Sequence, residues 1–311
     1  MKRPQLPGAR TGRKDCAVHI FPDSEAFGRQ FARAAHLAST LVTRHAFPDG
    51  ETLVRVHTPP GRHAVLVRSL YDPNAKLVEI LLAADALRRA GARTVTFIAP
   101  YLPYMRQDTV FAPGEPISQY VIGDCLHRAF DRVLTVEAHL HRTRRLSDVI
   151  SPRAKSLSAA PAVARWVRQT GWRTLLVGPD AESQAWIRPI AQAARCPCPW
   201  VVGHKQRLGD QRVEIRFPIL PTTPRAVIVD DVASSGGTLS TAVRVLRRAG
   251  VPTVDAVVVH AIFAPGAQAR IRRAGVRRLV SCDTIPHPTN EIHLAPLLAA
   301  TKEFHVEESG E

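Results

Sequence analysis

One stretch decides the fold class of this chain: Ala226-Val227-Ile228-Val229-Asp230-Asp231 and, after two intervening residues, Ser234-Ser235-Gly236-Gly237-Thr238. The uninterrupted apolar run is typical of a strand buried in a parallel sheet, and the residues from Leu239 to Ala249 have the pattern of a helix. In α/β sheets, ligands bind beyond the carboxyl ends of the strands, where this stretch places two carboxylates. It therefore predicts an α/β fold with a ligand site at the strand-to-helix junction.

The chemistry of this junction suits a phosphorylated sugar. Two neighbouring carboxylates can bind a diol directly or through Mg²⁺, which prefers oxygen ligands. Gly236 and Gly237 let backbone N–H groups approach an anion at the start of a helix, and the neighbouring hydroxyl groups add donors. A Ser/Thr helix cap after an ordinary turn would explain Ser235 and Thr238, but it would leave the acidic pair without a purpose. We therefore predict a phosphate and sugar site.

Part of the sequence occurs twice. Leu87-Arg88-Arg89-Ala90-Gly91 recurs 159 residues later as Leu246-Arg247-Arg248-Ala249-Gly250, and a β-rich run follows both copies. Upstream, Ala64 to Ser69 has the pattern of a short apolar strand before a helical pattern from Lys76 to Ala90, which matches the arrangement around Val227. Two duplicated α/β domains of similar topology are therefore expected. The first copy has neither the acidic pair nor the glycine-rich turn, so the second should carry the chemistry.

The length and the linkers give the expected domain limits. A chain of 311 residues exceeds the size of one ordinary core, so two domains of about 150 residues each are expected. Serine, proline and charged residues gather between 147 and 158, which places the boundary there. We expect a disordered basic tail at 1–14, an N-terminal domain at 15–150 and a C-terminal domain at 151–311, with the last helix packing on the N-terminal domain.

The chain is strongly basic, with 42 Lys and Arg against 27 Asp and Glu, for a net charge of +15. Such a charge suggests an anionic partner: nucleic acid, a membrane surface or phosphorylated small molecules. Aromatic residues make up 6% of the chain and no basic run contains them, so nucleic-acid binding is not expected. No apolar run is long enough to cross a bilayer, and no apolar segment follows the basic N-terminus as it would in a secretion signal. We therefore expect a cytoplasmic protein that binds no membrane. The five scattered cysteines are expected to be reduced thiols.

The junction at 227–238 resembles the signature loop of the type I phosphoribosyltransferase fold, which binds the ribose 5-phosphate part of its ligands. The resemblance implies two domains of this type, each a mainly parallel sheet flanked by helices. Most members have a third acid where Ser234 stands, so this chain has one charge fewer in the loop. The residues that the resemblance assigns to ribose 5-phosphate are Asp230, Asp231, Ser234, Ser235, Gly236, Gly237 and Thr238.

Four further motifs occur in order along the chain, and each is ordinary by itself. They are Phe47-Pro48-Asp49-Gly50-Glu51, Tyr104-Met105-Arg106-Gln107-Asp108, Glu137-Ala138-His139-Leu140-His141-Arg142 and Val177-Gly178-Pro179-Asp180. The Asp-Gly pair in the first motif is typical of a hairpin turn. Taken together, the order and spacing of the motifs resemble the ribose-phosphate pyrophosphokinase family, the phosphoribosyl pyrophosphate synthetases, from about Phe47 to Asn290.

This resemblance implies an ATP site that is shared between subunits. In the family, the first loop reaches across a subunit boundary to hold the adenine, a role that falls here on Phe47, Asp49 and Glu51. The pair that contacts the nucleotide corresponds to Arg106 and Gln107. A homo-oligomer, either a dimer or a hexamer, is therefore expected.

The same resemblance implies metal-associated and catalytic residues. His139, which also contacts ATP in this assignment, and Asp180 correspond to the residues around Mg–ATP. Lys205 and Arg207 correspond to the family's catalytic Lys-x-Arg, and Arg207 is assigned to ribose 5-phosphate as well. In an extended segment two such cations leave the chain on one face, where they could stabilise a transferring phosphoryl group. By itself, a Lys-x-Arg loop would more often be a solvated basic loop.

The expected reaction is transfer of diphosphate from Mg–ATP to the C1 hydroxyl of ribose 5-phosphate, which gives 5-phosphoribosyl 1-diphosphate and AMP. Two alternatives stay open. A non-catalytic regulatory homologue is supported by Ser234, by Glu137 where an Asp is usual, and by Glu182 in a stretch that is usually more glycine-rich. A phosphoribosyltransferase that consumes the product would need only one such domain, so the duplication disfavours it.

Overall fold

The structure is a computed structural model that describes residues 15–57, 59–140, 142–169, 171, 174–194, 198–207, 213–218 and 220–301. The basic tail predicted at 1–14 therefore lies outside the described residues. The chain divides into two compact units. Unit 1 consists of Met1–Thr135, Leu140–Lys155 and Ala295–Glu311, and unit 2 consists of Val136–His139 and Ser156–Leu294.

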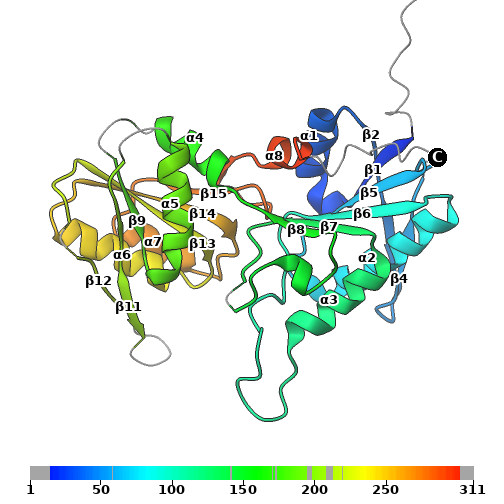
Figure 1. Cartoon of the computed structure of the whole chain (residues 1–311), viewed down its shortest axis with the longest axis horizontal. Helices are drawn as coiled ribbons and strands as arrows, with labels where there is room; N and C mark the ends of the chain where they lie inside the picture. Colours follow the sequence, from blue (N-terminus) through cyan, green and yellow to red (C-terminus); the bar gives the residue numbers. More distant parts are fainter. Residues whose placement is uncertain are drawn as a thin grey trace, which may run out of the picture. The chain divides into compact units, whose positions relative to one another are not determined.

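Unit 1 is built on a six-stranded sheet in the order β2-β1-β5-β6-β7-β8, whose pairings from β2 to β7 are parallel (Figure 1). The strands are β1 (Cys16–Ile20), β2 (Ala38–Leu41), β5 (His63–Val67), β6 (Thr94–Ala99), β7 (Arg132–Val136) and β8 (Ala154–Leu157). The helices are α1 (Glu25–Ala35), α2 (Pro73–Arg89), α3 (Ser118–Ala129) and α8 (Ala295–Ala299). The last of these, α8, packs against α1, although the two are far apart in the sequence.

Unit 2 repeats this plan with a second sheet, in the order β10-β9-β13-β14-β15-β16, and all of its pairings are parallel. Its strands are β9 (Thr174–Gly178), β10 (Trp200–Val202), β13 (Arg225–Ala233), β14 (Thr253–Ala261), β15 (Leu279–Cys282) and β16 (Asn290–Ile292). Its helices are α4 (Ala160–Gln169), α5 (Gln184–Ala193), α6 (Gly237–Arg248) and α7 (Ala267–Arg273). Helix α4 packs beside α5 and α6 beside α7, and the apolar faces of α6 and of the central strands form the core.

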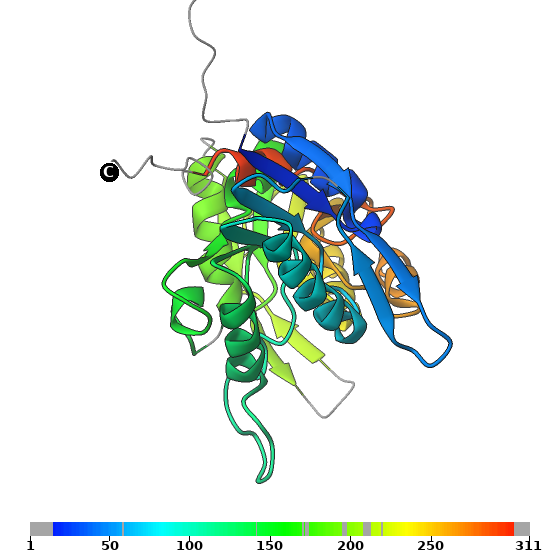
Figure 2. The same ribbon diagram turned by 90° about the vertical axis from the view of Figure 1, so that its right-hand side faces the viewer.

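Each unit also has an antiparallel hairpin outside its main sheet. In unit 1, β3 (Thr43–Ala46) pairs with β4 (Thr52–Arg55), and the hairpin extends away from the sheet (Figures 1 and 2). In unit 2, β11 (His204–Arg207) pairs with β12 (Val213–Arg216). The first hairpin carries the Phe47-Pro48-Asp49-Gly50-Glu51 motif, and the second carries Lys205 and Arg207.

The predicted fold class is confirmed, since both units are parallel sheets flanked by helices. The helix expected from Lys76 to Ala90 is α2, and the helix expected from Leu239 begins two residues earlier, at Gly237. The predicted domain limits at 150 and 151 stay a prediction.

Two further expectations concern the cysteines and the membrane. Cys16, Cys125 and Cys282 are free thiols, but Cys198 is disulfide-bonded, so the prediction of reduced thiols is wrong for Cys198. Cys196 lies outside the described residues. In the part of the chain that the structure describes, no helix has both the length and the apolar character that crossing a bilayer requires.

Candidate active site

Strand β13 carries the two acidic residues of the predicted sugar site. The sequence placed Asp230 and Asp231 at the end of a strand, but β13 continues to Ala233, so both residues lie within it. Each carboxylate accepts a backbone bond from the next residue: Asp231 N donates to Asp230 Oδ1 at 3.1 Å, and Val232 N donates to Asp231 Oδ1 at 2.7 Å. These bonds hold both carboxylates close to the strand.

His139 contacts Asp231, although 92 residues separate them in the sequence. Its Nδ1 donates a hydrogen bond to Asp231 Oδ2, and the side chains are 23% and 14% exposed. Burial by itself would raise the pKa of Asp231, but the bond from His139 and the charges of His139 and His260 outweigh it and lower the pKa. When a neutral histidine ring carries its proton on Nδ1, the lone pair is on Nε2, as in many metal-bound histidines.

The pKa of Asp230 is shifted in the opposite direction to that of Asp231. Its burial, followed by the negative charges of Asp231 and Asp180, raises its pKa well above the usual value, and Lys205 offsets this only in part. A raised pKa makes it easier for Asp230 to hold a proton and donate a hydrogen bond, whereas the lowered pKa of Asp231 favours a carboxylate that accepts. The pair can therefore recognise hydroxyl groups in both directions.

Asp180 lies at the carboxyl end of β9, where it begins the short turn Ala181–Ser183. Its Oδ1 accepts bonds from the backbone N and the Oγ of Ser183, at 3.2 and 2.8 Å. Its Oδ2 accepts a bond from Nζ of Lys205 at 3.1 Å, and these two side chains are 20% and 19% exposed. Asp180, Lys205 and Asp230 thus form one electrostatic group, which adjoins Asp231 and His139.

Two glycines bring the β11–β12 hairpin close to the end of β9. Gly203 N donates to Gly178 O at 2.8 Å. A Cβ at Gly203 would lie 2.9 Å from the backbone O of Pro179, and a Cβ at Gly178 would lie 2.5 Å from Cβ of Ser183. Larger residues at either position would therefore move Lys205 away from Asp180.

Lys205 and Arg207 both lie on β11, where they pair with Ile215 and Val213 of β12. The two residues therefore lie on one strand of an antiparallel hairpin. The side chain of Arg207 lies outside the described part of the chain, as does the loop at 208–212.

The loop between β13 and α6 carries the predicted phosphate-binding residues. Gly236 has a φ of 72°, a left-handed conformation, and α6 begins directly after it at Gly237. Ser235 Oγ accepts only a long bond, 3.4 Å, from Gly237 N, and Thr238 lies inside the helix. An ordinary Ser/Thr cap therefore does not account for this loop, and the first N–H groups of a 12-residue helix point toward it.

The predicted metal residues are held by different partners, because His139 bonds to Asp231 and Asp180 bonds to Lys205 and Ser183. Throughout the described ranges, no three His, Cys, Asp or Glu side chains are grouped in a way that could hold a metal ion.

The residues predicted to hold the adenine form the tip of the β3–β4 hairpin in unit 1. Phe47 N donates to Glu51 O at 2.8 Å, and Asp49 Oδ1 accepts from Glu51 N at 3.1 Å, so the tip is a defined turn. Gly50 has a φ of 91°, which suits glycine. The Phe47 side chain is 40% exposed and packs edge-on against His45, with ring centres 4.8 Å apart. An exposed aromatic side chain at a hairpin tip is suited to contact with another molecule.

Arg106 and Gln107 lie in the connection between β6 and α3, also in unit 1. Arg106 is exposed, whereas Gln107 accepts a bond from Ser118 Oγ and donates a 3.5 Å bond to Glu115. The neighbouring Asp108 has a fully buried side chain that accepts bonds from N and Nη1 of Arg142, at 2.9 and 2.7 Å. The geometry therefore gives Gln107 and Asp108 a part in shaping this loop.

Two residues of the site were missed by sequence reasoning. Ser183 orients Asp180 through the reciprocal bonds described above, and its position three residues after an Asp is a recognisable capping signal. His260 follows the apolar run of β14 and hydrogen-bonds to the backbone of Glu137. A polar residue near the carboxyl end of a buried parallel strand was the available signal for it.

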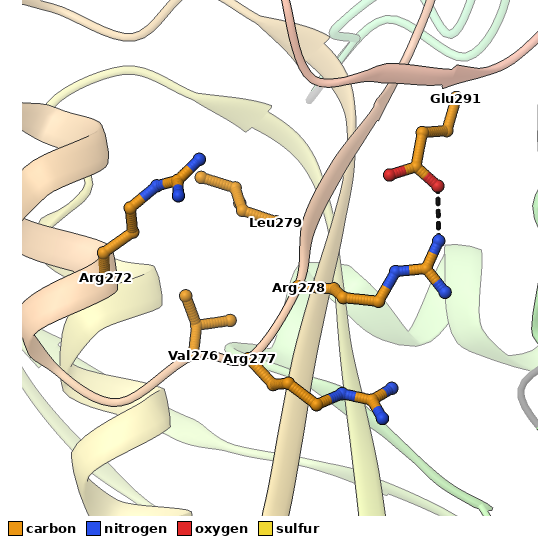
Figure 3. Close-up of a pocket in the computed structure, with 6 residues that line it drawn as sticks. All are labelled: Arg272, Val276, Arg277, Arg278, Leu279 and Glu291. Atoms are coloured by element: carbon orange, nitrogen blue, oxygen red, sulfur yellow. Dashed lines mark hydrogen bonds and ion pairs between the residues drawn. The ribbon is translucent and has the colours of Figure 1, made fainter.

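A pocket of about 370 Å³ lies elsewhere on unit 2, and none of the predicted site residues line it (Figure 3). Its lining residues are Arg272, Val276, Arg277, Arg278, Leu279 and Glu291. Two of its three arginines already have carboxylate partners, since Arg277 bonds to Asp255 at 2.6 and 2.9 Å and Arg278 bonds to Glu291. These ion pairs leave little net positive charge for a bound anion.

Comparison with known proteins agrees with this organisation. Residues 18–129 match the family model of the N-terminal domain of ribose phosphate pyrophosphokinase, and residues 150–297 match that of the phosphoribosyl transferase domain. The chain is 32% identical over 280 residues to the ribose-phosphate pyrophosphokinase of Methanopyrus kandleri, which covers 89% of this chain and 94% of that protein. It is 33% identical over 281 residues to ribose-phosphate pyrophosphokinase 2 of Archaeoglobus fulgidus, and the match covers 89% of this chain and 97% of that protein.

A solved structure is similar over nearly the whole chain. The phosphoribosylpyrophosphate synthetase of Mycobacterium smegmatis superposes with a TM-score of 0.79 at 25% identity, covering 92% of this chain and 97% of that one. With both domains, the curated relatives and the fold in agreement, this chain belongs to the ribose-phosphate pyrophosphokinase family and is an enzyme.

Proposed function

We propose that the protein transfers diphosphate from Mg–ATP to the C1 hydroxyl of ribose 5-phosphate, giving 5-phosphoribosyl 1-diphosphate and AMP. The family supports synthesis of phosphoribosyl diphosphate in general terms. One observation supports the specific reaction with Mg–ATP and ribose 5-phosphate. The mostly buried ammonium of Lys205 lies 3.1 Å from Asp180, beside the buried Asp230. A cation held next to a sugar-binding carboxylate is suited to stabilise charge on a transferring phosphoryl group.

Ribose 5-phosphate is proposed to bind at the β13–α6 junction. Its 5-phosphate would accept bonds from the first N–H groups of α6 and from the hydroxyls of the loop, where the helix dipole favours an anion. Its ring hydroxyls would lie against Asp230 and Asp231. Because the pKa of Asp230 is raised and that of Asp231 is lowered, Asp230 is the better suited to donate to a hydroxyl and Asp231 to accept from one. The loop residues with this role are Ser234, Ser235, Gly236, Gly237 and Thr238.

Mg²⁺ is proposed to enter with ATP as part of the substrate. Such ions keep several waters and bind one or two protein carboxylates together with phosphate oxygens. The donor set fits that mode, since Asp180 and Asp231 are carboxylates and His139 presents an imidazole, while no larger ligand group occurs in the described residues. The ion would neutralise charge on the phosphate oxygens, and His139 and Asp180 would hold it in place.

Lys205 and Arg207 are proposed to close over the β-phosphoryl group. The C1 hydroxyl attacks the β-phosphorus, and the bond from this phosphorus to the oxygen that stays with AMP breaks. Such a reaction depends on alignment and on charge neutralisation. In this arrangement, Lys205 would exchange Asp180 for the phosphoryl oxygens, and the hairpin position of both cations would let them approach after the substrates bind.

The ATP base is proposed to bind between subunits of a homo-oligomer, a dimer or a hexamer. Phe47, Asp49 and Glu51 sit on an exposed hairpin tip, where they could reach a second copy of the chain. Arg106 and Gln107 would contact the same nucleotide. The reaction belongs to nucleotide synthesis, and we expect it to occur in the cytoplasm.

The test is the Lys205→Ala variant, assayed for AMP and phosphoribosyl diphosphate with Mg²⁺, ATP and ribose 5-phosphate. We expect kcat to fall by about 10³-fold or more, as for other cations that act in phosphoryl transfer, while ribose 5-phosphate binding changes little. Arg216→Ala is the matched control, because Arg216 is an exposed cation on the same hairpin whose ion pair is with Glu214. Near-normal turnover in Lys205→Ala would refute the catalytic role.

The same assay on the unaltered protein decides between the proposed reaction and a non-catalytic regulatory role. The substitutions at Ser234, Glu137 and Glu182 favour the regulatory role. Absence of AMP at every phosphate concentration tried would support it. Stoichiometric AMP and phosphoribosyl diphosphate would exclude it.

A further inference from the structure

His260 is a buried histidine that the proposed reaction does not use. It lies on β14 with 2% of its surface exposed, and both of its ring nitrogens face hydrogen-bond partners. Nδ1 is 2.9 Å from Oγ1 of Thr284, and Nε2 is 3.2 Å from the backbone O of Glu137. These partners determine which nitrogens carry protons.

Both partners act as acceptors when the ring and the Thr284 hydroxyl make all three of their bonds together. A backbone carbonyl has no proton, so Nε2 must donate to Glu137 O. The hydroxyl of Thr284 has a single proton, which it donates to the backbone O of Val259 at 2.7 Å. The oxygen of that hydroxyl is therefore left to accept from Nδ1. A ring that makes both bonds carries two N–H groups and a positive charge.

Several titratable groups lie near the ring or beside its hydrogen-bond partners. Asp231 on the neighbouring strand has its pKa lowered in part by the charge of His260. Burial and the charge of Asp231 raise the pKa of Glu137 to about 7. Beside Thr284, burial raises the pKa values of Cys282 and Asp283. Among these groups, Asp231 is the one whose pKa is lowered, and a carboxylate of this kind would stabilise a positively charged ring.

The carbonyl that His260 holds belongs to a strained turn. Glu137 has a φ of 43°, a left-handed conformation that is unfavourable for a residue with a side chain. Its other groups are also fixed: its N donates to Leu157 O at 3.0 Å, and its Oε1 accepts from Ser158 Oγ and Ala159 N at 2.8 and 2.6 Å. The bond from His260 completes this set.

His139 follows this turn directly, two residues after Glu137. A turn fixed at N, O and side chain leaves the next residues little freedom, so the direction of the His139 ring depends on it. The ring must be correctly directed both to bond Asp231 and to act on Mg–ATP as proposed.

We propose that His260 is a doubly protonated, positively charged histidine whose Nε2–H holds the Glu137 carbonyl and thereby directs His139. The part of this proposal that concerns His139 and catalysis rests on the function proposed above. The charge of His260 does not depend on that function. His260 is a positioning residue in this account, because it acts through Glu137 and touches no substrate.

The first experiment reads the charge directly. The full-length protein labelled with ¹⁵N-histidine is examined by NMR at about pH 8, above the ordinary histidine pKa of about 6.5. We expect two protonated nitrogens for His260, with its signals assigned by their loss in His260→Gln. In Thr284→Val, which removes the acceptor, Nδ1 should lose its proton. A neutral ring in the unaltered protein at this pH would overturn the proposal.

The second experiment compares His260→Gln with His260→Leu. A Gln amide can still donate to Glu137 O, whereas Leu cannot, although it fills space. We expect Leu to lower kcat by about 10–100-fold, the usual effect of removing a residue that orients a ligand, and Gln to recover part of that loss. The KM for ribose 5-phosphate should change little. Equal losses for Gln and Leu would indicate a packing role and overturn the positioning role.

The control is His63→Gln, because His63 also bonds to a threonine hydroxyl, at 2.8 Å, but lies on β5 of unit 1. Its kcat should stay unchanged. If the unaltered protein forms no AMP, the proposed function fails, but the charge of His260 is still decided by NMR. In that case, a shift of the His139 ring signals in His260→Leu supports the positioning role, and unshifted signals overturn it.

Discussion

His19 gives the sharpest test of the energetics of unit 1. It lies on β1 with 0% of its surface exposed, and neither ring nitrogen has a hydrogen-bond partner within the described structure. Burial lowers its pKa from 6.5 to about 4. The folded protein therefore resists protonating this ring, whereas the unfolded chain protonates it below about pH 6.5.

The sign and size of the effect follow from linkage. Above pH 6.5 the lowered pKa of His19 does not reduce the free energy of unfolding. As the pH falls from 6.5 toward 4, that free energy decreases, because only the unfolded chain takes up the proton. With about 1.4 kcal/mol per pKa unit, the full loss is about 3 kcal/mol, of which about 2 kcal/mol has occurred at pH 5. His19→Leu, which cannot bind a proton, should lack this loss.

The two units can be followed separately, because all four Tyr of the chain lie in unit 1 and all four Trp in unit 2. Urea unfolding is measured at pH 7.5 and pH 5, with tyrosine absorbance reporting on unit 1 and tryptophan fluorescence on unit 2. The change in unfolding free energy of unit 1 between the two pH values should be about 2 kcal/mol smaller in His19→Leu than in the unaltered protein. An equal change in both proteins would refute the reasoning.

Two further predictions concern a buried ion group and the cap of Asp180. Glu79→Ala removes a 7% exposed carboxylate partner of the fully buried Arg68, which keeps its bond to Asp23 and its contact with the Phe21 ring. Unit 1 should lose about 3–5 kcal/mol in urea unfolding, and a loss under 1 kcal/mol would contradict this. Ser183→Ala removes the 2.8 Å bond that orients Asp180, so kcat should fall about tenfold in the AMP assay with Tm nearly unchanged. Unchanged kcat would show that the cap does not position Asp180.

Much of the fold could be predicted because its causes are local. Apolar runs such as Val227 to Val229 and glycines after helices mark strands and helix ends wherever they occur. The turn at Asp49-Gly50 and the helix start after Gly236 likewise depend on backbone conformations that few other residues adopt. Strand ends were less accurate, since pairing with β14 carries β13 four residues past the apolar run that ends at Val229.

The sequence by itself determined that two parallel-sheet units exist and that acidic, hydroxyl and basic side chains gather near the ends of the second sheet's strands. The tertiary structure decided which of them meet: His139 with Asp231, Lys205 with Asp180, and His260 with the backbone of Glu137. The physical reason is that these contacts join residues 25 to 123 positions apart, so they depend on strand order and turn geometry. The periodicity of the sequence shows on which side of its own helix or strand a side chain lies. It does not show which residue of another element that side chain contacts.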